Sequence, residues 1–194
     1  MALPFYLTLV RVVMSPIFLV LYLHGQAWGI SQTTLPFVLL FIVVLCEITD
    51  FFDGFLARRY GNVTELGKIL DPMADSIFRL SVFLSFTQGV VQIPLMVVLL
   101  IFLRESIITS LRTVCALQGV ALAARISGKV KAVIQATTVF FILGLMIPYS
   151  TGHLAPHLLQ NLSFYAATIA AFYTVVSGIE YLTANWKFIR KAFG

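Results

Sequence analysis

Charged side chains are scarce in this sequence. They make up 11% of the 194 residues, against about 25% in an ordinary soluble domain. Hydrophobic residues make up 60%, and the mean hydropathy is +0.98. So few polar residues cannot cover the surface of a soluble fold of this size, and the same composition excludes a disordered chain. The sequence therefore predicts an all-α integral membrane protein.

Cysteine is almost absent as well. The two residues of this type, Cys46 and Cys115, both fall within apolar segments. Such a pair gives no disulfide framework. We expect both to be buried as small hydrophobic side chains.

Six apolar segments approach the length of about 20 residues that a helix needs to cross a bilayer. Their bounds are Pro4–Leu23, Leu35–Phe52, Pro72–Thr87, Pro94–Cys115, Val130–Tyr149 and Leu162–Trp186. Glycine and proline residues mark the connections between these segments, as is typical of helix ends. Residues 1–194 are therefore expected to form a single domain of six transmembrane helices.

Basic residues occur in alternate connections. Residues 24–34, 87–94 and 150–161 include no Lys or Arg. The other connections and the C-terminal end hold Arg58, Arg59, Lys68, Arg125, Lys129, Lys131, Lys187, Arg190 and Lys191. Because basic connections stay in the cytoplasm, both termini are predicted to be cytoplasmic. The short connections place any active site at helix ends.

Aspartate is confined to one window of 26 residues. Asp50 and Asp53 are three residues apart near the end of the second segment, and Asp71 and Asp75 are four apart at the start of the third. Both spacings place a pair on one helix face. If the connection folds back, the four carboxylates converge at the cytoplasmic membrane edge. Carboxylates next to lipid are costly and mark functional sites.

Purely structural roles explain these aspartates unevenly. Asp71 precedes Pro72, so it could cap the third helix, but Asp75 lies a full turn further along. At the C-terminal end of a helix, Asp50 and Asp53 would each cost about 0.3–1 kcal/mol. A cation must offset that cost, and either Arg58 and Arg59 or a metal ion could supply it.

The neighbouring residues favour a metal and a phosphate ligand. Carboxylate oxygens suit Mg²⁺, Mn²⁺ or Ca²⁺ better than zinc, and the histidines fall in connections on the opposite side: His24, His153 and His157. Gly54 and Ala57 follow Asp50 by one and two helical turns and permit close approach. Arg58 suits bidentate contact with phosphate. The set therefore indicates a diphosphate site.

These residues form one extended motif. It reads Asp50-x-x-Asp53-Gly54-x-x-Ala57-Arg58, then eight residues, then Gly67-x-x-x-Asp71-x-x-x-Asp75. The motif is similar to the signature of the CDP-alcohol phosphotransferases. The resemblance implies a homodimeric membrane enzyme with six spans, which transfers a group from a CDP-linked donor to an acceptor hydroxyl and releases CMP.

The resemblance also implies roles for individual residues. Asp50, Asp53 and Asp71 would hold one or two Mg²⁺ or Mn²⁺ ions, and Asp75 would complete the metal site or act as general base. The nucleotide and its diphosphate would contact Asp53, Gly54, Ala57, Arg58 and Gly67. Two positions depart from the family pattern: Phe5 replaces a common Asn, and Ser76 replaces a common Lys. Arg79, one turn beyond Asp75, could supply the missing charge.

Weaker motifs outside the signature point to an acceptor. Residues 3–11, 104–112, 118–120, 128–135 and 177–181 resemble bacterial phosphatidylglycerophosphate synthases. That resemblance implies CDP-diacylglycerol as donor, sn-glycerol 3-phosphate as acceptor, and a multi-pass protein of the bacterial inner (cytoplasmic) membrane.

A small dianionic acceptor needs basic residues beside the metal site. The candidates, in order, are Arg112 and Lys129, then Arg104 and Lys131. The two arginines lie inside an apolar segment, where a purely topological role is unconvincing. The two lysines could equally reflect the preference for basic cytoplasmic connections. Glu105 and Glu180 could pair with the two arginines.

Other functions remain open at this stage. The same chemistry could use an inositol phosphate, phosphatidylglycerol (giving cardiolipin) or a neutral alcohol such as choline. A cation transporter would also place carboxylates within the membrane, but all four aspartates lie at one edge. A scaffold leaves the aspartates unexplained, and nucleic acid is not an expected partner.

Overall fold

The computed structural model describes the backbone of residues 3–60, 65–117 and 125–193 and the side chains of residues 9–49, 73–115 and 125–190. Its regular elements are all α-helices, as the composition predicts. They are α1 (Leu3–His24), α2 (Leu35–Tyr60), α3 (Glu65–Ser85), α4 (Leu95–Leu117), α5 (Ile126–Ser150) and α6 (Pro156–Phe193).

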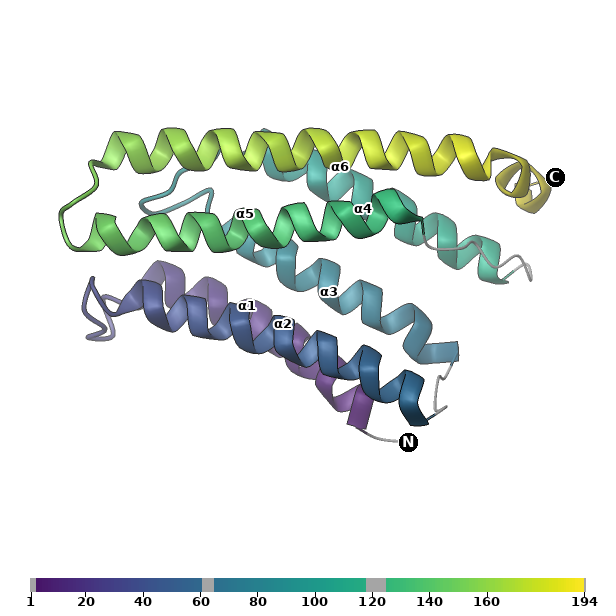
Figure 1. Cartoon of the computed structure of the whole chain (residues 1–194), viewed down its shortest axis with the longest axis horizontal. Coiled ribbons are helices and arrows are strands. Elements are labelled where there is room, and N and C mark those ends of the chain that lie inside the picture. The colour runs from purple at the N-terminus through teal and green to yellow at the C-terminus, as the bar shows by residue number, and fades with distance from the viewer. Residues whose placement is uncertain (1–2, 61–64, 118–124, 194) are drawn as a thin grey trace.

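The helices form one bundle in which consecutive helices run in opposite directions (Figure 1). Helix α1 packs on α2 and α3, α5 packs on α2 and α6, and α4 packs on α3 and α6. Helix α3 also contacts α5, so α3 and α5 are the two central helices. The connections 25–34, 86–94 and 151–155 lie at the left of Figure 1, which we call the loop end. The opposite end, which we call the basic end, combines the starts of α1, α3 and α5 with the ends of α2, α4 and α6.

Several helices are longer than the predicted spans, mostly at the basic end, although α6 also begins at Pro156, before the predicted Leu162 and at the loop end. Helix α2 continues past Phe52 to Tyr60, and α6 continues past Trp186 to Phe193. Helix α3 begins at Glu65 rather than at Pro72. The interpretation of Asp71 as a helix cap is therefore wrong. Hydropathy identifies only the apolar part of a helix, and charged turns that continue the helix outside the membrane escape it.

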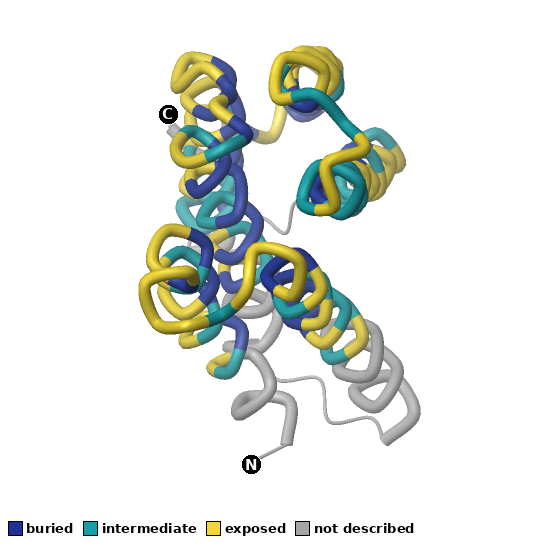
Figure 2. The backbone as a smooth tube through the Cα atoms, turned by 90° about the vertical axis from the view of Figure 1, so that its left-hand side faces the viewer, coloured by how far each residue is buried: buried dark blue, intermediate teal, exposed yellow. Residues whose placement is uncertain are grey.

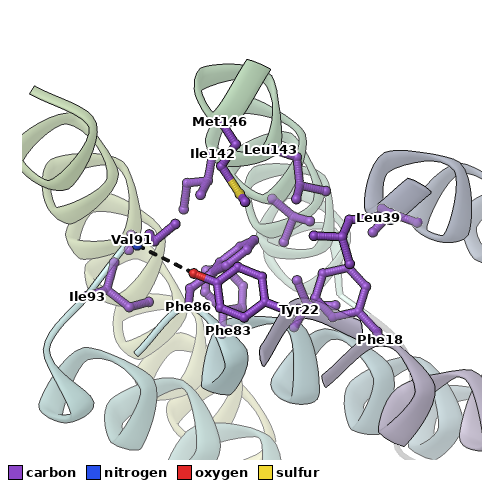
Figure 3. Packing of buried hydrophobic residues seen from close by; sticks show 14 of the residues in the cluster. Phe18, Tyr22, Leu39, Phe83, Phe86, Val91, Ile93, Ile142, Leu143 and Met146 are labelled. Atoms are coloured by element: carbon purple, nitrogen blue, oxygen red, sulfur yellow. Dashed lines mark hydrogen bonds between the residues drawn. The ribbon is translucent and has the colours of Figure 1, made fainter. Parts of the chain in front are cut away.

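The interior of the bundle changes character along its length. The loop-end half is filled by apolar side chains, among them Phe18, Phe83, Phe86 and Leu143 (Figure 3). Most buried polar side chains lie in the other half. They include Arg11, Ser15, Arg79, Glu105, Lys131, Gln135, Thr174, Ser177 and Asn185. Buried polar groups cost stability unless they are paired, so this half is where a function is to be sought.

Tyr22 fastens α1 to the connection between α3 and α4 at the loop end. Its hydroxyl donates to the carbonyl oxygen of Gln88 at 3.0 Å and accepts the N–H of Val91 at 3.4 Å (Figure 3). Gly89 adopts φ +67°, and a Cβ there would lie 3.1 Å from the tyrosine ring. A larger residue would be strained at this turn and would crowd Tyr22.

The outer surface of the bundle is apolar. Phe41, Leu95 and Phe172 are exposed, and in Figure 2 the buried faces of the helices turn toward one another. Within the part of the chain that the structure describes, two helical stretches are long and apolar enough to cross a membrane, Ile126–Ser150 and Pro156–Arg190. These features are those of a membrane protein.

The cysteines and histidines lie as the sequence predicts. Cys46 and Cys115 are both free and buried. The three histidines are exposed near the loop end: His24, His153 and His157. The histidines therefore lie at the end of the bundle opposite the aspartate motif, as the sequence predicts.

Candidate active site

The aspartate motif spans the parts of α2 and α3 that lie toward the basic end. Helix α2 includes Asp50 and Asp53, and α3 includes Asp71 and Asp75. The side chains of Asp50, Asp53, Asp71 and Arg58, and the predicted contacts at Gly54, Ala57 and Gly67, lie outside the described residues. The convergence of all four carboxylates therefore stays a prediction, and the described geometry begins at Asp75.

Asp75 forms an ion pair with Arg79. The guanidinium Nη2 lies 2.9 Å from the Asp75 Oδ1, one helical turn away on α3. The Arg79 Nε lies 3.5 Å from Glu47 Oε1 on α2, and Nη1 donates to the carbonyl oxygen of Ala132 on α5 at 3.3 Å. Arg79 is only 7% exposed. One buried cation thus connects three helices next to the proposed base.

A second buried polar cluster surrounds Glu105 on α4. Its carboxylate accepts hydrogen bonds from Lys131 Nζ on α5 at 2.5 Å, from Arg104 Nη1 at 3.3 Å and from Ser76 Oγ on α3 at 3.2 Å. Arg104 is therefore paired with Glu105, as expected. Two cations share one carboxylate here, so the cluster retains a net positive charge.

Arg112 is held against α6 rather than by a carboxylate. Its Nε donates to the hydroxyl of Tyr181 at 3.0 Å, and the guanidinium carbon lies 5.0 Å from the centroid of that ring. Arginine packs favourably on an aromatic face. Tyr181 is almost fully buried, so it fixes the direction of the arginine side chain.

Glu180 does not pair with an arginine of α4. Its carboxylate lies 2.6 Å from the Nε of Arg125, just before α5, and accepts a hydrogen bond from Ser127. This contact fastens the start of α5 to α6. The partner differs from the expectation because the rotation of α6 directs Tyr181, the next residue, toward Arg112.

The four predicted acceptor residues all lie in the half of the bundle that includes the basic end, but their surroundings differ. Arg104 and Lys131 share Glu105, and Arg112 contacts Tyr181. Lys129 is exposed at the start of α5. A Cβ added to Gly178 would lie 2.9 Å from the Cγ of Arg104, so glycine there permits the close approach of α6.

Sequence reasoning missed Glu47, and it did not recognise Ser76 as a hydrogen-bond donor to Glu105. A signal for Glu47 was present, because it is an acidic residue in an apolar segment, three residues before Asp50. Such a spacing places it on the same face of α2 as that aspartate. Tyr181 falls within the motif at residues 177–181, but its contact with Arg112 could not be predicted, since that contact depends on how α4 and α6 pack.

Of the four predicted metal ligands, the structure describes the side chain of Asp75. Asp75 is an oxygen donor whose side chain is 26% exposed, and Mg²⁺ and Mn²⁺ prefer such ligands. Among the residues described, no three His, Cys, Asp or Glu side chains come together as a metal site. The other proposed ligands, Asp50, Asp53 and Asp71, lie outside that part of the chain.

The chain matches a known protein family along most of its length. The family model for CDP-alcohol phosphatidyltransferase matches residues 1–179. The chain belongs to this family, and the resemblance seen in the aspartate motif is confirmed.

Individual relatives match over nearly the whole chain. A protein of Bacillus subtilis is 32% identical over 194 residues, covering 97% of both chains. A protein of Rickettsia typhi is 33% identical, covering 94% of this chain and 96% of its own, and one of Yersinia enterocolitica is 34% identical, covering 95% and 94%. All three are named CDP-diacylglycerol–glycerol-3-phosphate 3-phosphatidyltransferase.

Proposed function

We propose that this protein transfers a phosphatidyl group from CDP-diacylglycerol to a hydroxyl of sn-glycerol 3-phosphate, giving phosphatidylglycerophosphate and CMP. The observation that carries the proposal is the match, over nearly the full length of each chain, to relatives named for this donor and acceptor. The cluster of basic residues in the same half of the bundle as Asp75 supports it, because the acceptor is a dianion.

We also propose that all six helices cross the bacterial inner membrane with both termini in the cytoplasm. The apolar outer surface supports this topology, as does the lack of Lys and Arg in residues 24–34, 87–94 and 150–161. The basic end then faces the cytoplasm. The active site lies at the cytoplasmic edge of the bilayer, where a lipid-linked donor and a water-soluble acceptor can meet.

On the donor side, Asp50, Asp53 and Asp71, with Asp75, would hold Mg²⁺ or Mn²⁺. Such an ion, when bound, neutralises charge that develops on the diphosphate. Arg58 would contact the diphosphate, and small residues would let the nucleotide approach the backbone of α2 and α3. We assign the nucleotide contacts to Asp53, Gly54, Ala57 and Gly67.

In the reaction, the acceptor hydroxyl attacks the phosphorus that carries the diacylglycerol. The bond from that phosphorus to the oxygen of CMP breaks, and CMP leaves. The hydroxyl proton passes to Asp75, which acts as general base. The partial exposure of the Asp75 side chain leaves it accessible to substrate.

On the acceptor side, the phosphate of glycerol 3-phosphate would be bound first by Arg112 and Lys129. Arg104 and Lys131 would add positive charge, because they share a single carboxylate in Glu105. Charge-assisted hydrogen bonds to a phosphate are about twice as strong as neutral ones. The basic cluster therefore favours an anionic acceptor over a neutral alcohol.

The protein is also proposed to act as a homodimer, which rests on the family resemblance alone. A row of alanines on α6 could have formed the dimer contact. However, Ala167, Ala170 and Ala171 are buried within the single chain, so they do not support that contact. Chemical cross-linking in native membranes measures the oligomeric state directly.

A CMP-release assay tests the proposed reaction. Purified protein in detergent receives CDP-diacylglycerol, Mg²⁺ or Mn²⁺, and one acceptor at a time: glycerol 3-phosphate, inositol phosphate, phosphatidylglycerol or choline. We expect CMP only with glycerol 3-phosphate, and none when a chelator removes the metal. Release with a different acceptor would reassign the substrate, and no release from folded protein would overturn the enzymatic function.

A further inference from the structure

Arg79 makes more contacts than the neutralisation of one carboxylate requires. Its Nη2, Nε and Nη1 atoms approach Asp75, Glu47 and the carbonyl oxygen of Ala132 respectively. These partners lie on α3, α2 and α5. A guanidinium has five N–H donors in one rigid plane, whereas a lysine has a single point of charge on a flexible stem. One arginine can therefore contact three helices at once and fix their positions relative to one another near Asp75.

Ser76, the residue after Asp75 on α3, begins a second connection toward α5. Ser76 donates to Glu105 of α4, and Glu105 accepts from Lys131 of α5. On α3 the two connections start within one helical turn of Asp75, and on α5 they end at neighbouring residues, Lys131 and Ala132. Two connections between the same pair of helices fix both the rotation and the register of α3 against α5.

The two helices joined in this way carry the two halves of the proposed chemistry. Helix α3 carries the base Asp75, and α5 begins with Lys129 and Lys131 of the acceptor site. Proton transfer requires the base to lie within hydrogen-bond reach of the acceptor hydroxyl. The distance between base and acceptor therefore depends on how α3 sits against α5, and Arg79 makes the direct hydrogen bond between these two helices.

We propose that Arg79 is a positioning residue for phosphatidyl transfer: it holds the Asp75 carboxylate in a fixed place relative to the acceptor-binding start of α5. This inference rests on the proposed function. Substrate binding does not require it, because the predicted donor and acceptor contacts are other residues. A displacement of a reacting group by about 1 Å can cost about 100-fold in rate, so loss of Arg79 lowers kcat much more than it changes KM.

The first test replaces Arg79 alone. Arg79→Met is expected to lower kcat by about 10- to 100-fold, with KM for donor and acceptor changed less than about twofold. Arg79→Lys keeps the charge but cannot reach three partners at once, so it is expected to recover only part of kcat. An equal loss of kcat and of substrate binding would overturn the positioning role.

The second test separates positioning from stability. Arg79→Met leaves Glu47 without this cation and is expected to lower the midpoint of thermal unfolding. The double variant Glu47→Gln/Arg79→Met removes both charges of this ion pair, so its unfolding midpoint is expected to recover while kcat stays low. Recovery of kcat together with stability would show that Arg79 is merely structural, and would overturn the proposal.

A readout independent of turnover completes the design. CDP-diacylglycerol is expected to raise the unfolding midpoint of the double variant as much as that of the natural protein, because ligand binding stabilises the folded state. Loss of that shift would place Arg79 in donor binding instead. Tyr22→Phe is the matched control, since it removes a hydrogen bond between α1 and the connection from α3 to α4 at the loop end and is expected to leave kcat unchanged.

These outcomes distinguish the two proposals. If the natural protein releases no CMP with any acceptor, the proposed function fails before Arg79 is tested. If the natural protein is active and the double variant recovers kcat, the function stands and the role of Arg79 fails.

Discussion

At the scale of single residues, the site depends on which charged groups are already paired. Asp75 is bonded to Arg79, and Glu105 is shared by Arg104 and Lys131. Lys129 is exposed, and Arg112 rests on an uncharged tyrosine. The residues without a carboxylate in these contacts are the ones best suited to meet a substrate phosphate.

Asp75 is the first residue to test. Asp75→Asn keeps the size of the side chain but removes its basicity. We expect at least about a 100-fold loss of kcat, within the range that general acid–base catalysis contributes, while CDP-diacylglycerol still binds. CMP release and equilibrium binding of the donor measure the two effects separately. Loss of donor binding as well would assign Asp75 to the metal rather than to proton transfer.

Lys129 tests the acceptor site. Lys129→Met is expected to raise KM for glycerol 3-phosphate by about 5- to 10-fold, equivalent to about 1–1.4 kcal/mol, with kcat and donor KM nearly unchanged. Lys129 is exposed, and surface substitutions change stability little, so a rise in this KM is not expected to come from a folding defect. Steady-state kinetics with varied acceptor measures the change. An unaltered acceptor KM would leave Lys129 with only its topological role.

At the scale of helices, the sequence predicts the positions of all six helices and misses where several of them end. The apolar segments are long enough to be recognised from hydropathy alone. The charged turns of α3 before Pro72 and of α2 after Phe52 are not, because polar helical turns look like connections in a hydropathy profile.

The candidate site likewise has features that the sequence predicts and features that it does not. The aspartate motif is readable from spacing, since neighbours at three and four residues share a helix face. The contacts of Arg79 with Ala132 and of Arg112 with Tyr181 are not, because they join residues 53 and 69 positions apart. Such contacts depend on the rotation of each helix in the bundle, which no local pattern encodes.

The close contact of α4 with α6 leads to a prediction for Gly178. A Cβ at this position would lie 2.9 Å from the Cγ of Arg104, so Gly178→Ala must displace that arginine stem. We expect KM for glycerol 3-phosphate to rise by about 2- to 5-fold, because Arg104 moves relative to Glu105, a cost of about 0.4–1 kcal/mol. Acceptor kinetics provide the measurement.

Gly144 supplies the matched control for this substitution. It lies within α5, and a Cβ there would meet nothing within 4 Å. Gly144→Ala is therefore expected to leave the kinetics unchanged and to stabilise the helix by up to about 1 kcal/mol. Equal kinetic effects of the two substitutions would mean that the contact with Arg104 has no role in acceptor binding.

At the scale of the whole molecule, the two ends of the bundle differ in charge and in packing. The loop-end half is filled by apolar side chains, and a path for cations would have to pass through it. This packing favours a site open to one side of the membrane over a transport pathway. The candidate active site and the apolar core thus occupy separate halves of the same bundle.

Labelling with a membrane-impermeant thiol reagent tests the proposed orientation. Both native cysteines are buried, so a single new cysteine dominates the signal. In intact cells stripped of their outer membrane, Gln92→Cys at the loop end is expected to react and Lys187→Cys at the basic end is not. Inverted vesicles should reverse the result. Labelling of both positions from one side would contradict the six-span topology.

The crowding of basic residues at one end has a consequence for how substrate arrives. The chain has a net charge of +5, and its cations gather where the acceptor must enter. A positive field around a site raises the local concentration of a dianion and speeds its diffusional encounter. This field reaches about 8 Å at physiological ionic strength and shrinks as salt is added. In the proposed function, electrostatic steering would draw the soluble acceptor to the basic end, so activity at low acceptor concentration is expected to fall as the ionic strength rises.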